Sequence, residues 1–184
     1  MCNKMANSRN DFSSIFGGTN NRICGVSNMI GGGNTNLIGS LAPGEPHTDH
    51  SFIGGGRENW IDSTGAATTF GSIGGGQNNY IAPGTNHASI FGGNNNSVAD
   101  SCSSILGGTG NVIPAGFANS HIVGSGITLG AGVGNAGSLH VNGLWANGIQ
   151  FNPLGANPGT VFALAPGALP LFPLSINGGV LWIA

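Results

Sequence analysis

The sequence predicts an all-β fold of stacked coils, a β-roll or β-solenoid of six to seven short turns. Six copies of one short pattern lie between Ile15 and Ile113. In every copy two aliphatic anchors stand eight residues apart, with Asn two places before the second anchor and a Gly-Gly pair between them. Such fixed-period similarity is typical of architectures in which each unit buries its apolar face only against its neighbours.

The anchors and the repeated Asn form the predicted structural ladder. We expect the anchors in the core and the Asn side chains in an amide ladder, each hydrogen-bonded to the next coil. The first anchors are Ile15, Ile30, Ile53, Ile73, Ile90 and Ile105; the second anchors are Ile23, Ile38, Ile61, Ile81, Val98 and Ile113; the amides are Asn21, Asn36, Asn59, Asn79, Asn96 and Asn111. A degraded seventh copy begins at Ile122.

Each coil has room for two short strands. Ser-Ile pairs such as 14–15, 72–73 and 89–90 open the first strand, and Asn-x-Ile closes the second. Gly-Gly supplies the turn between them, where positive φ costs little. Alternation along the second strand points its middle residue outward. This predicted outward row contains Arg22, Leu37, Trp60, Tyr80, Ser97 and Val112.

The coils differ in length at one place only. Successive first anchors are 15 to 23 residues apart, and every insertion falls between a second anchor and the next first anchor. The insertions 39–52, 62–72 and 82–89 should therefore project from one edge of the stack. One-sided insertions are usual on the binding face of a solenoid.

Three regions follow from this pattern. Residues 1–12 are polar and unpatterned and are predicted to dock the protein to a particle, and residues 13–130 form the repeat shaft. Beyond a glycine-rich linker at 130–137, residues 138–151 alternate like strand, turn and strand. We interpret 131–184 as a small β knob that caps the stack or holds a trimer together.

Charge is scarce and unevenly placed. Charged residues make up 5% of the chain, and none follows Asp100. A monomer with so little charge would be poorly soluble, so we expect an obligate oligomer; a neutral coat of Asn, Ser, Thr and Gly is the alternative. No basic stripe favours nucleic acid. Pro166, Pro170 and Pro173 break the apolar tail, which disfavours membrane insertion. The first residues lack an apolar core and predict no signal peptide.

Few residues suggest chemistry. His47, Asp49 and His50 are weak candidates for a metal site, but two histidines and one acid are not a specific ligand set, and a solvated loop is the favoured interpretation. Trp60 and Tyr80 either form an exposed platform for sugar rings or pack against neighbouring elements. The thiols of Cys2, Cys24 and Cys102 lack metal spacing and are expected to be small buried side chains. We expect no cofactor and no enzymatic activity.

The unit Ser-x-Ile-x-Gly-Gly-x-x-Asn-x-Ile resembles the β-roll repeats of trimeric autotransporter adhesin heads, and more closely those of phage and viral tail or head fibres. The resemblance covers about residues 13–143. It implies a homotrimer of intertwined or side-by-side β-rolls displayed on a surface. The sequence shows neither the catalytic residues of the chaperone domain that often follows such repeats nor a secretion signal, so we expect neither feature. A virion fibre or surface-decoration protein, made in the host cytoplasm and exposed on the particle, therefore fits better than a bacterial adhesin head.

The expected function is attachment to a glycan or protein receptor on a host surface, with a virion, tail or capsid protein bound through the N-terminus. An ice- or polysaccharide-binding solenoid is the alternative, although the outward row lacks the regular threonines of ice binders. A glycan-cleaving enzyme would need two acids across a groove, about 5–10 Å apart. Only Glu45, Asp49, Glu58, Asp62 and Asp100 follow the first segment, so this class is disfavoured.

Overall fold

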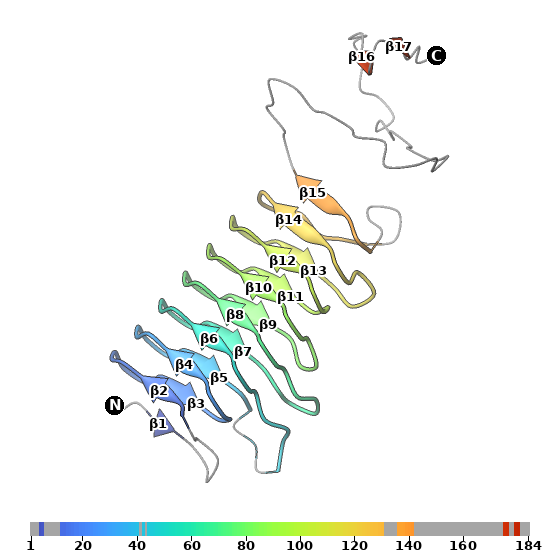
Figure 1. The fold of residues 1–184 in the computed structure, drawn as a ribbon. Coiled ribbons are helices and arrows are strands. Elements are labelled where there is room, and N and C mark those ends of the chain that lie inside the picture. The colour runs from blue at the N-terminus through green and yellow to red at the C-terminus, as the bar shows by residue number, and fades with distance from the viewer. Residues whose placement is uncertain are drawn as a thin grey trace. The chain divides into compact units, whose positions relative to one another are not determined.

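The computed structural model describes residues 4–5, 12–40, 42, 44–130, 136–141, 175–176 and 179–180. None of these residues lies in a helix, and those of the first 144 positions form an all-β solenoid of about seven turns, which confirms the predicted fold class (Figure 1). None of them belongs to a helix with the length and apolarity needed to cross a membrane. The chain divides into two compact units, residues 1–144 and 145–184.

Two parallel sheets build the solenoid, and each coil gives one strand to each. The even sheet contains β2 (Ser14–Ile15), β4 (Met29–Ile30), β6 (Phe52–Ile53), β8 (Ser72–Ile73), β10 (Ser89–Ile90), β12 (Ser104–Ile105), β14 (His121–Val123) and β15 (Leu139–Val141). The odd sheet contains β1 (Lys4–Met5), β3 (Arg22–Ile23), β5 (Leu37–Ile38), β7 (Trp60–Ile61), β9 (Tyr80–Ile81), β11 (Ser97–Val98) and β13 (Val112–Ile113).

The register stacks like residues on like. Ile15 pairs with Ile30 and Ile30 with Ile53 in the even sheet, and Ile23 pairs with Ile38 in the odd sheet. From coil to coil the anchors thus form two columns that face each other. Every anchor from Ile23 to Ile113 is fully buried, and Ile122 and Leu129 continue the core. Ile15 lies at the end of its column and is only half-buried.

Between the columns runs a ladder of buried amides. Asn36 Nδ2 donates to Asn21 Oδ1 at 3.0 Å and to the carbonyl oxygens of Gly32 and Gly56 at 2.9 and 3.0 Å. The same bonds recur at each later amide (Asn59, Asn79, Asn96 and Asn111). Because each amide is bonded within its own coil and to both neighbours, burial leaves it satisfied and fixes the register of the stack.

The turns explain the invariant glycines. Gly93 has φ +93°, and a Cβ there would overlap the carbonyl oxygen of Gly108 in the next coil. The adjacent turns are uniform along one edge of the stack, whereas the loops of variable length line the opposite edge (Figure 1). The one-sided placement of the insertions thus follows from a turn that tolerates no extra residue.

Both ends of the shaft extend beyond the repeat pattern. Lys4–Met5 pairs with Arg22–Ile23, so part of the predicted docking segment joins the odd sheet. Leu139–Val141, which the sequence assigns to the C-terminal region, pairs with His121–Val123 and lengthens the even sheet. His140 there takes the place of the core isoleucines, opposite Ile122.

In the second unit the structure describes one antiparallel pair, β16 (Ser175–Ile176) with β17 (Gly179–Val180). The rest of the predicted knob, apart from 136–141, lies outside the described residues. The same holds for the predicted docking segment except Lys4, Met5 and Phe12.

Candidate binding surfaces

The outward row of the odd sheet is the most varied surface of the shaft. Its register places Lys4 beside Arg22, Arg22 beside Leu37, and Leu37 beside Trp60. Tyr80, Ser97 and Val112 continue the row. The row thus changes along the shaft from cationic through apolar and aromatic to small side chains.

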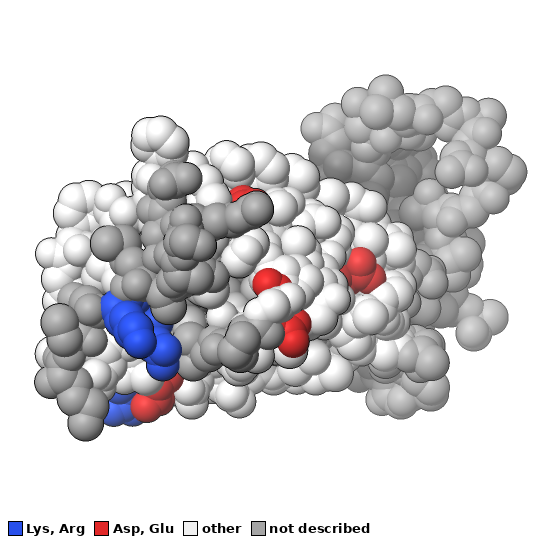
Figure 2. All heavy atoms as spheres, turned by 90° about the horizontal axis from the view of Figure 1, so that it is seen from below, with Lys and Arg blue, Asp and Glu red and all other residues white. Residues whose placement is uncertain are grey.

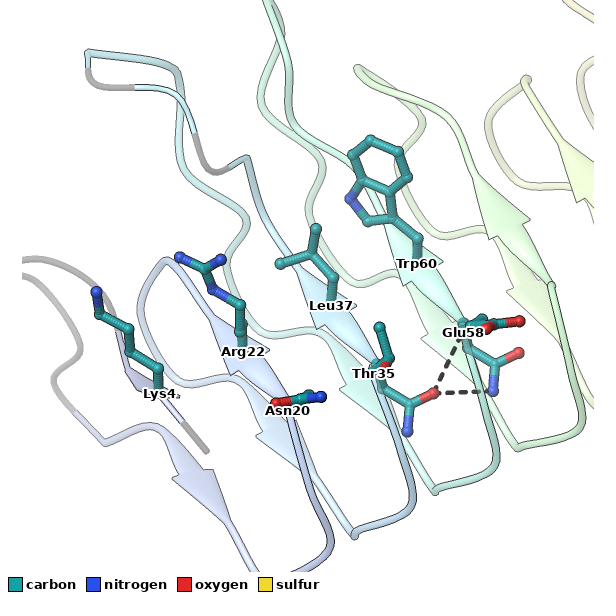
Figure 3. A pocket seen from close by; sticks show the side chains of 9 residues that line it. Lys4, Asn20, Arg22, Thr35, Leu37, Glu58 and Trp60 are labelled. Carbon is teal, nitrogen blue, oxygen red and sulfur yellow. Dashed lines mark hydrogen bonds between the residues drawn. The ribbon is translucent and has the colours of Figure 1, made fainter. Parts of the chain in front are cut away.

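A groove of about 520 Å³ opens over the first four coils of this row (Figure 3). It is lined by Lys4, Asn20, Arg22, Thr35, Asn36, Leu37, Glu58, Asn59 and Trp60. The side chains of Lys4, Arg22, Leu37 and Trp60 extend from the sheet in the same general direction (Figure 3). Asn20, Thr35 and Glu58 come from the neighbouring corner, where φ is +59°, +58° and +57°.

Only some of the charged side chains in and beside this groove have a partner of opposite charge. Glu58 Oε2 lies 3.6 Å from Arg57 Nε, an exposed pair outside the strand row. Arg22 Nε is buried and has no hydrogen-bond partner. On the face drawn in Figure 2, basic atoms gather toward one end of the stack together with one acidic group, and the other Asp and Glu atoms are spread farther along it. Among the described residues the groove therefore presents cationic groups without a carboxylate partner of their own.

Trp60 and Tyr80 form a fixed aromatic pair. Their ring centroids are 5.4 Å apart at an interplanar angle of 62°, an edge-to-face contact. Trp60 Nε1 donates to the carbonyl oxygen of Gly39 at 3.2 Å, and the Tyr80 hydroxyl donates to Asp62 Oδ2 at 2.9 Å. Burial, reinforced by this bond to Asp62, raises the pKa of Tyr80 to about 12. The pair packs internally, while Trp60 remains 36% exposed.

The three metal candidates of the longest insertion have different surroundings. Asp49 Oδ1 accepts from the Val26 amide at 2.9 Å, His50 stacks on Phe70 with centroids 5.2 Å apart, and His47 Nδ1 is buried without a hydrogen-bond partner. In the described part of the chain no three His, Cys, Asp or Glu side chains gather in a metal-binding arrangement. Asp49 and His50 each have a structural contact instead.

The favoured interpretation of this insertion as a freely solvated loop is wrong for the part that packs on the shaft. Thr48 is fully buried, and the carbonyl oxygen of Pro46 accepts from Ser63 Oγ at 2.7 Å. The loop therefore packs back on the following coil, because its backbone groups find partners there. Sequence alone shows the length of an insertion but not these partners.

A second row of rings lies at the corner that precedes the even sheet. Phe70 stacks between His50 and His87, with centroid distances of 5.2 and 4.9 Å and interplanar angles of 19°. The next corner holds Cys102, which is exposed, so the prediction of a buried thiol is wrong there; Cys24 is half-buried. All four corner residues have φ near +56° and therefore point outward at equivalent places in their coils.

The outer face of the even sheet carries an apolar row at the C-terminal end of the shaft. The residue after each buried anchor points outward, and on four successive coils it is Phe91, Leu106, Val123 or Val141. They are 65, 51, 40 and 37% exposed. Leu139, beside Val141, is also 65% exposed. We call these five residues the apolar row.

Neither a family model, nor a curated protein, nor a solved structure matches this chain.

Proposed function

We propose that this chain is a structural fibre or surface-decoration protein of a virus or phage, that it works as a homotrimer, and that it attaches the particle to a host surface. The viral assignment rests on the resemblance of the repeat unit to fibre repeats. The solenoid supports the structural role, because the side chains buried in it are the repeat anchors and amides that hold successive coils together.

The single observation that carries the trimer is the apolar row. Four of its members stand on four successive coils, so they form a continuous stripe about 14 Å long at roughly 4.8 Å per coil. The same part of the chain has no charged residue after Asp100 to keep such a stripe in water. Contiguous exposed apolar surface of this kind marks an interaction site.

A second copy of the chain is the occupant that best fits the stripe. Identical copies packed side by side in the same direction bring identical coils to the same level, so each apolar residue meets its counterpart. A closed, symmetric assembly also covers the stripe on every copy, whereas an open assembly leaves the stripe of its last copy exposed to water. Three copies are the number implied by the repeat resemblance.

Attachment is proposed for surfaces that such an assembly leaves free, namely the odd sheet and the insertion loops. Trp60 keeps the alternative of a polysaccharide-binding solenoid open, because its ring is partly exposed in a groove. The outward row offers no regular array of small hydroxyl residues, so ice binding has no support of its own.

Light scattering of the purified full chain, before and after heating in detergent, tests the proposal. The expected particle contains three chains, and a fraction that keeps this mass in detergent would support an intertwined trimer. A monomer at all concentrations would contradict it, since the apolar row would then be stable in water.

A further inference from the structure

The groove at the first coils of the odd sheet has the chemistry of a ligand site. Its volume of about 520 Å³ falls within the range of about 300–1,000 Å³ that is usual for small-molecule sites. We propose that it binds a carboxylated sugar, that is, a single acidic residue of a saccharide chain and part of its neighbour. This inference rests on the proposed attachment function and names its ligand class.

The cationic end of the groove provides the carboxylate contact. Lys4 and Arg22 are direct neighbours in register, and both side chains extend from the same face of the sheet (Figure 3). Neither forms an ion pair with a carboxylate of the described residues, and Arg22 Nε is buried without a hydrogen-bond partner. Arg22 as a whole is only half-buried and lines the groove, so its guanidinium can pair with a ligand carboxylate through charge-assisted hydrogen bonds.

The opposite end provides an apolar and aromatic wall. Leu37 and Trp60 follow Arg22 on the next two coils, so the row from Lys4 to Trp60 spans roughly 14 Å. The Trp60 indole nitrogen is held by Gly39, and the indole contacts the Tyr80 ring in an edge-to-face pair. An aromatic ring held in place offers its face to the C–H side of a sugar ring at little entropic cost.

A sugar fits this arrangement better than the other anions. Nucleic acid needs a run of phosphate contacts, and the whole chain has only four Lys and Arg residues. An acidic peptide would use the cations but not the flat aromatic wall. A carboxylated sugar uses both, and the amide of Asn20 on the groove's side can donate to and accept from its hydroxyl groups.

Titration calorimetry of the full chain tests the inference with two acidic probes, trigalacturonate and a sialylated disaccharide, and with a neutral galactose trisaccharide. We expect at least one acidic probe to bind, more weakly as salt is raised, and the neutral probe to bind much more weakly. Binding of neither acidic probe overturns the inference, and so does equal binding of the neutral one. Equal or tighter binding of triglutamate would instead identify an acidic-peptide site and also overturn it.

Three variants locate the site. Arg22→Gln should lower the affinity about tenfold or more, since it removes a charge-assisted bond. Arg57→Gln removes the same unit of charge outside the lining and should change the affinity far less. Glu58→Gln should tighten binding, because it removes the carboxylate among the lining residues. If Arg22→Gln and Arg57→Gln weaken binding equally, the groove is not the site.

A fourth variant tests the sugar ring itself. Trp60→Leu keeps an apolar wall but removes the indole face, so the acidic sugar should bind more weakly while triglutamate is unaffected. Unchanged sugar affinity in this variant would contradict the aromatic contact. The mass of each variant is measured in parallel. A trimer that binds no acidic sugar would contradict this inference alone. A monomer that binds acidic sugar would contradict the proposed trimeric fibre but support the sugar site in the groove.

Discussion

At the scale of single residues, the repeated Asn contributes more than its polarity suggests. Asn96 donates to Asn79 Oδ1 and to two carbonyl oxygens, and its own Oδ1 accepts from the backbone amide and the side chain of Asn111 at 3.0 Å. Hydrogen bonds that join three coils in this way couple the coils to one another. At this buried position an amide should stabilise the fold more than an aliphatic side chain would, because the surrounding backbone groups need hydrogen-bond partners.

Asn96→Ala should therefore lower the free energy of unfolding by about 3 kcal/mol, because it leaves the buried amide of Asn111 and a neighbouring carbonyl oxygen without partners. Urea unfolding at a fixed protein concentration measures the loss. Asn94→Ala, two residues earlier on the exposed corner, is the matched control and should change stability by less than about 0.5 kcal/mol. Equal effects of the two substitutions would show that the ladder is not the source of stability.

Tyr80 offers a spectroscopic test, because it is the chain's one tyrosine. Its pKa is raised from 10.0 to about 12, so the folded protein favours the neutral phenol. The resulting stabilisation is complete below the unfolded pKa of 10.0 and is lost as pH rises toward 12. Ultraviolet titration of tyrosinate should give a midpoint near 12 in the native protein. Asp62→Asn should move it down but keep it above 10.0, since burial is the larger cause; a native midpoint at 10.0 would contradict the buried contact.

At the scale of the coil, one glycine of each turn sets the distance to the next coil. Gly93→Ala places a Cβ against the Gly108 carbonyl at φ +93° and should destabilise the protein by more than about 2 kcal/mol. Gly92→Ala is the matched control, since a Cβ there has open space and an ordinary φ, and its effect should lie within about 0.5 kcal/mol of zero. Thermal unfolding of both variants checks the difference. Similar melting temperatures would mean that the coils are not as closely stacked as described.

The sequence reveals the regular elements because their spacing is constant. Anchors eight residues apart, with Gly-Gly between them, predict two strands and a turn in every coil, and these are the strands observed. The end strands are a different matter. Lys4–Met5 and Leu139–Val141 lack the full pattern, and they become strands only because a preceding or following coil offers an open sheet edge.

The sequence predicts only part of the candidate groove, because only some of its lining residues lie within the repeat. Arg22, Leu37 and Trp60 share a repeat position, so their common face can be predicted from the spacing. Lys4 has no repeat around it, and its place beside Arg22 follows from the pairing of β1 with β3. Likewise, the bond from Tyr80 to Asp62 joins the row to an insertion, whose path no periodicity describes.

At the scale of the whole molecule, the two sheets have different outer faces. The odd sheet combines charge, amides and an aromatic pair, whereas the C-terminal half of the even sheet exposes the apolar row. Under the proposed function, the odd sheet is the face for ligands and the even sheet is the face for other copies of the chain. The proposed interface would also account for the lack of charge after Asp100, because buried interface surfaces are depleted in charged residues.

The most direct test of this account is the particle mass of Leu106→Arg compared with Thr109→Arg and the unchanged chain. Leu106 lies in the middle of the apolar row, and Thr109, three residues later, is exposed on another row of the same coil. An arginine at 106 would be buried without a partner between copies, so we expect light scattering to show single chains for this variant and three chains for the other two. A Leu106→Arg protein that keeps the mass of the unchanged chain would contradict the claim that the apolar row joins the copies.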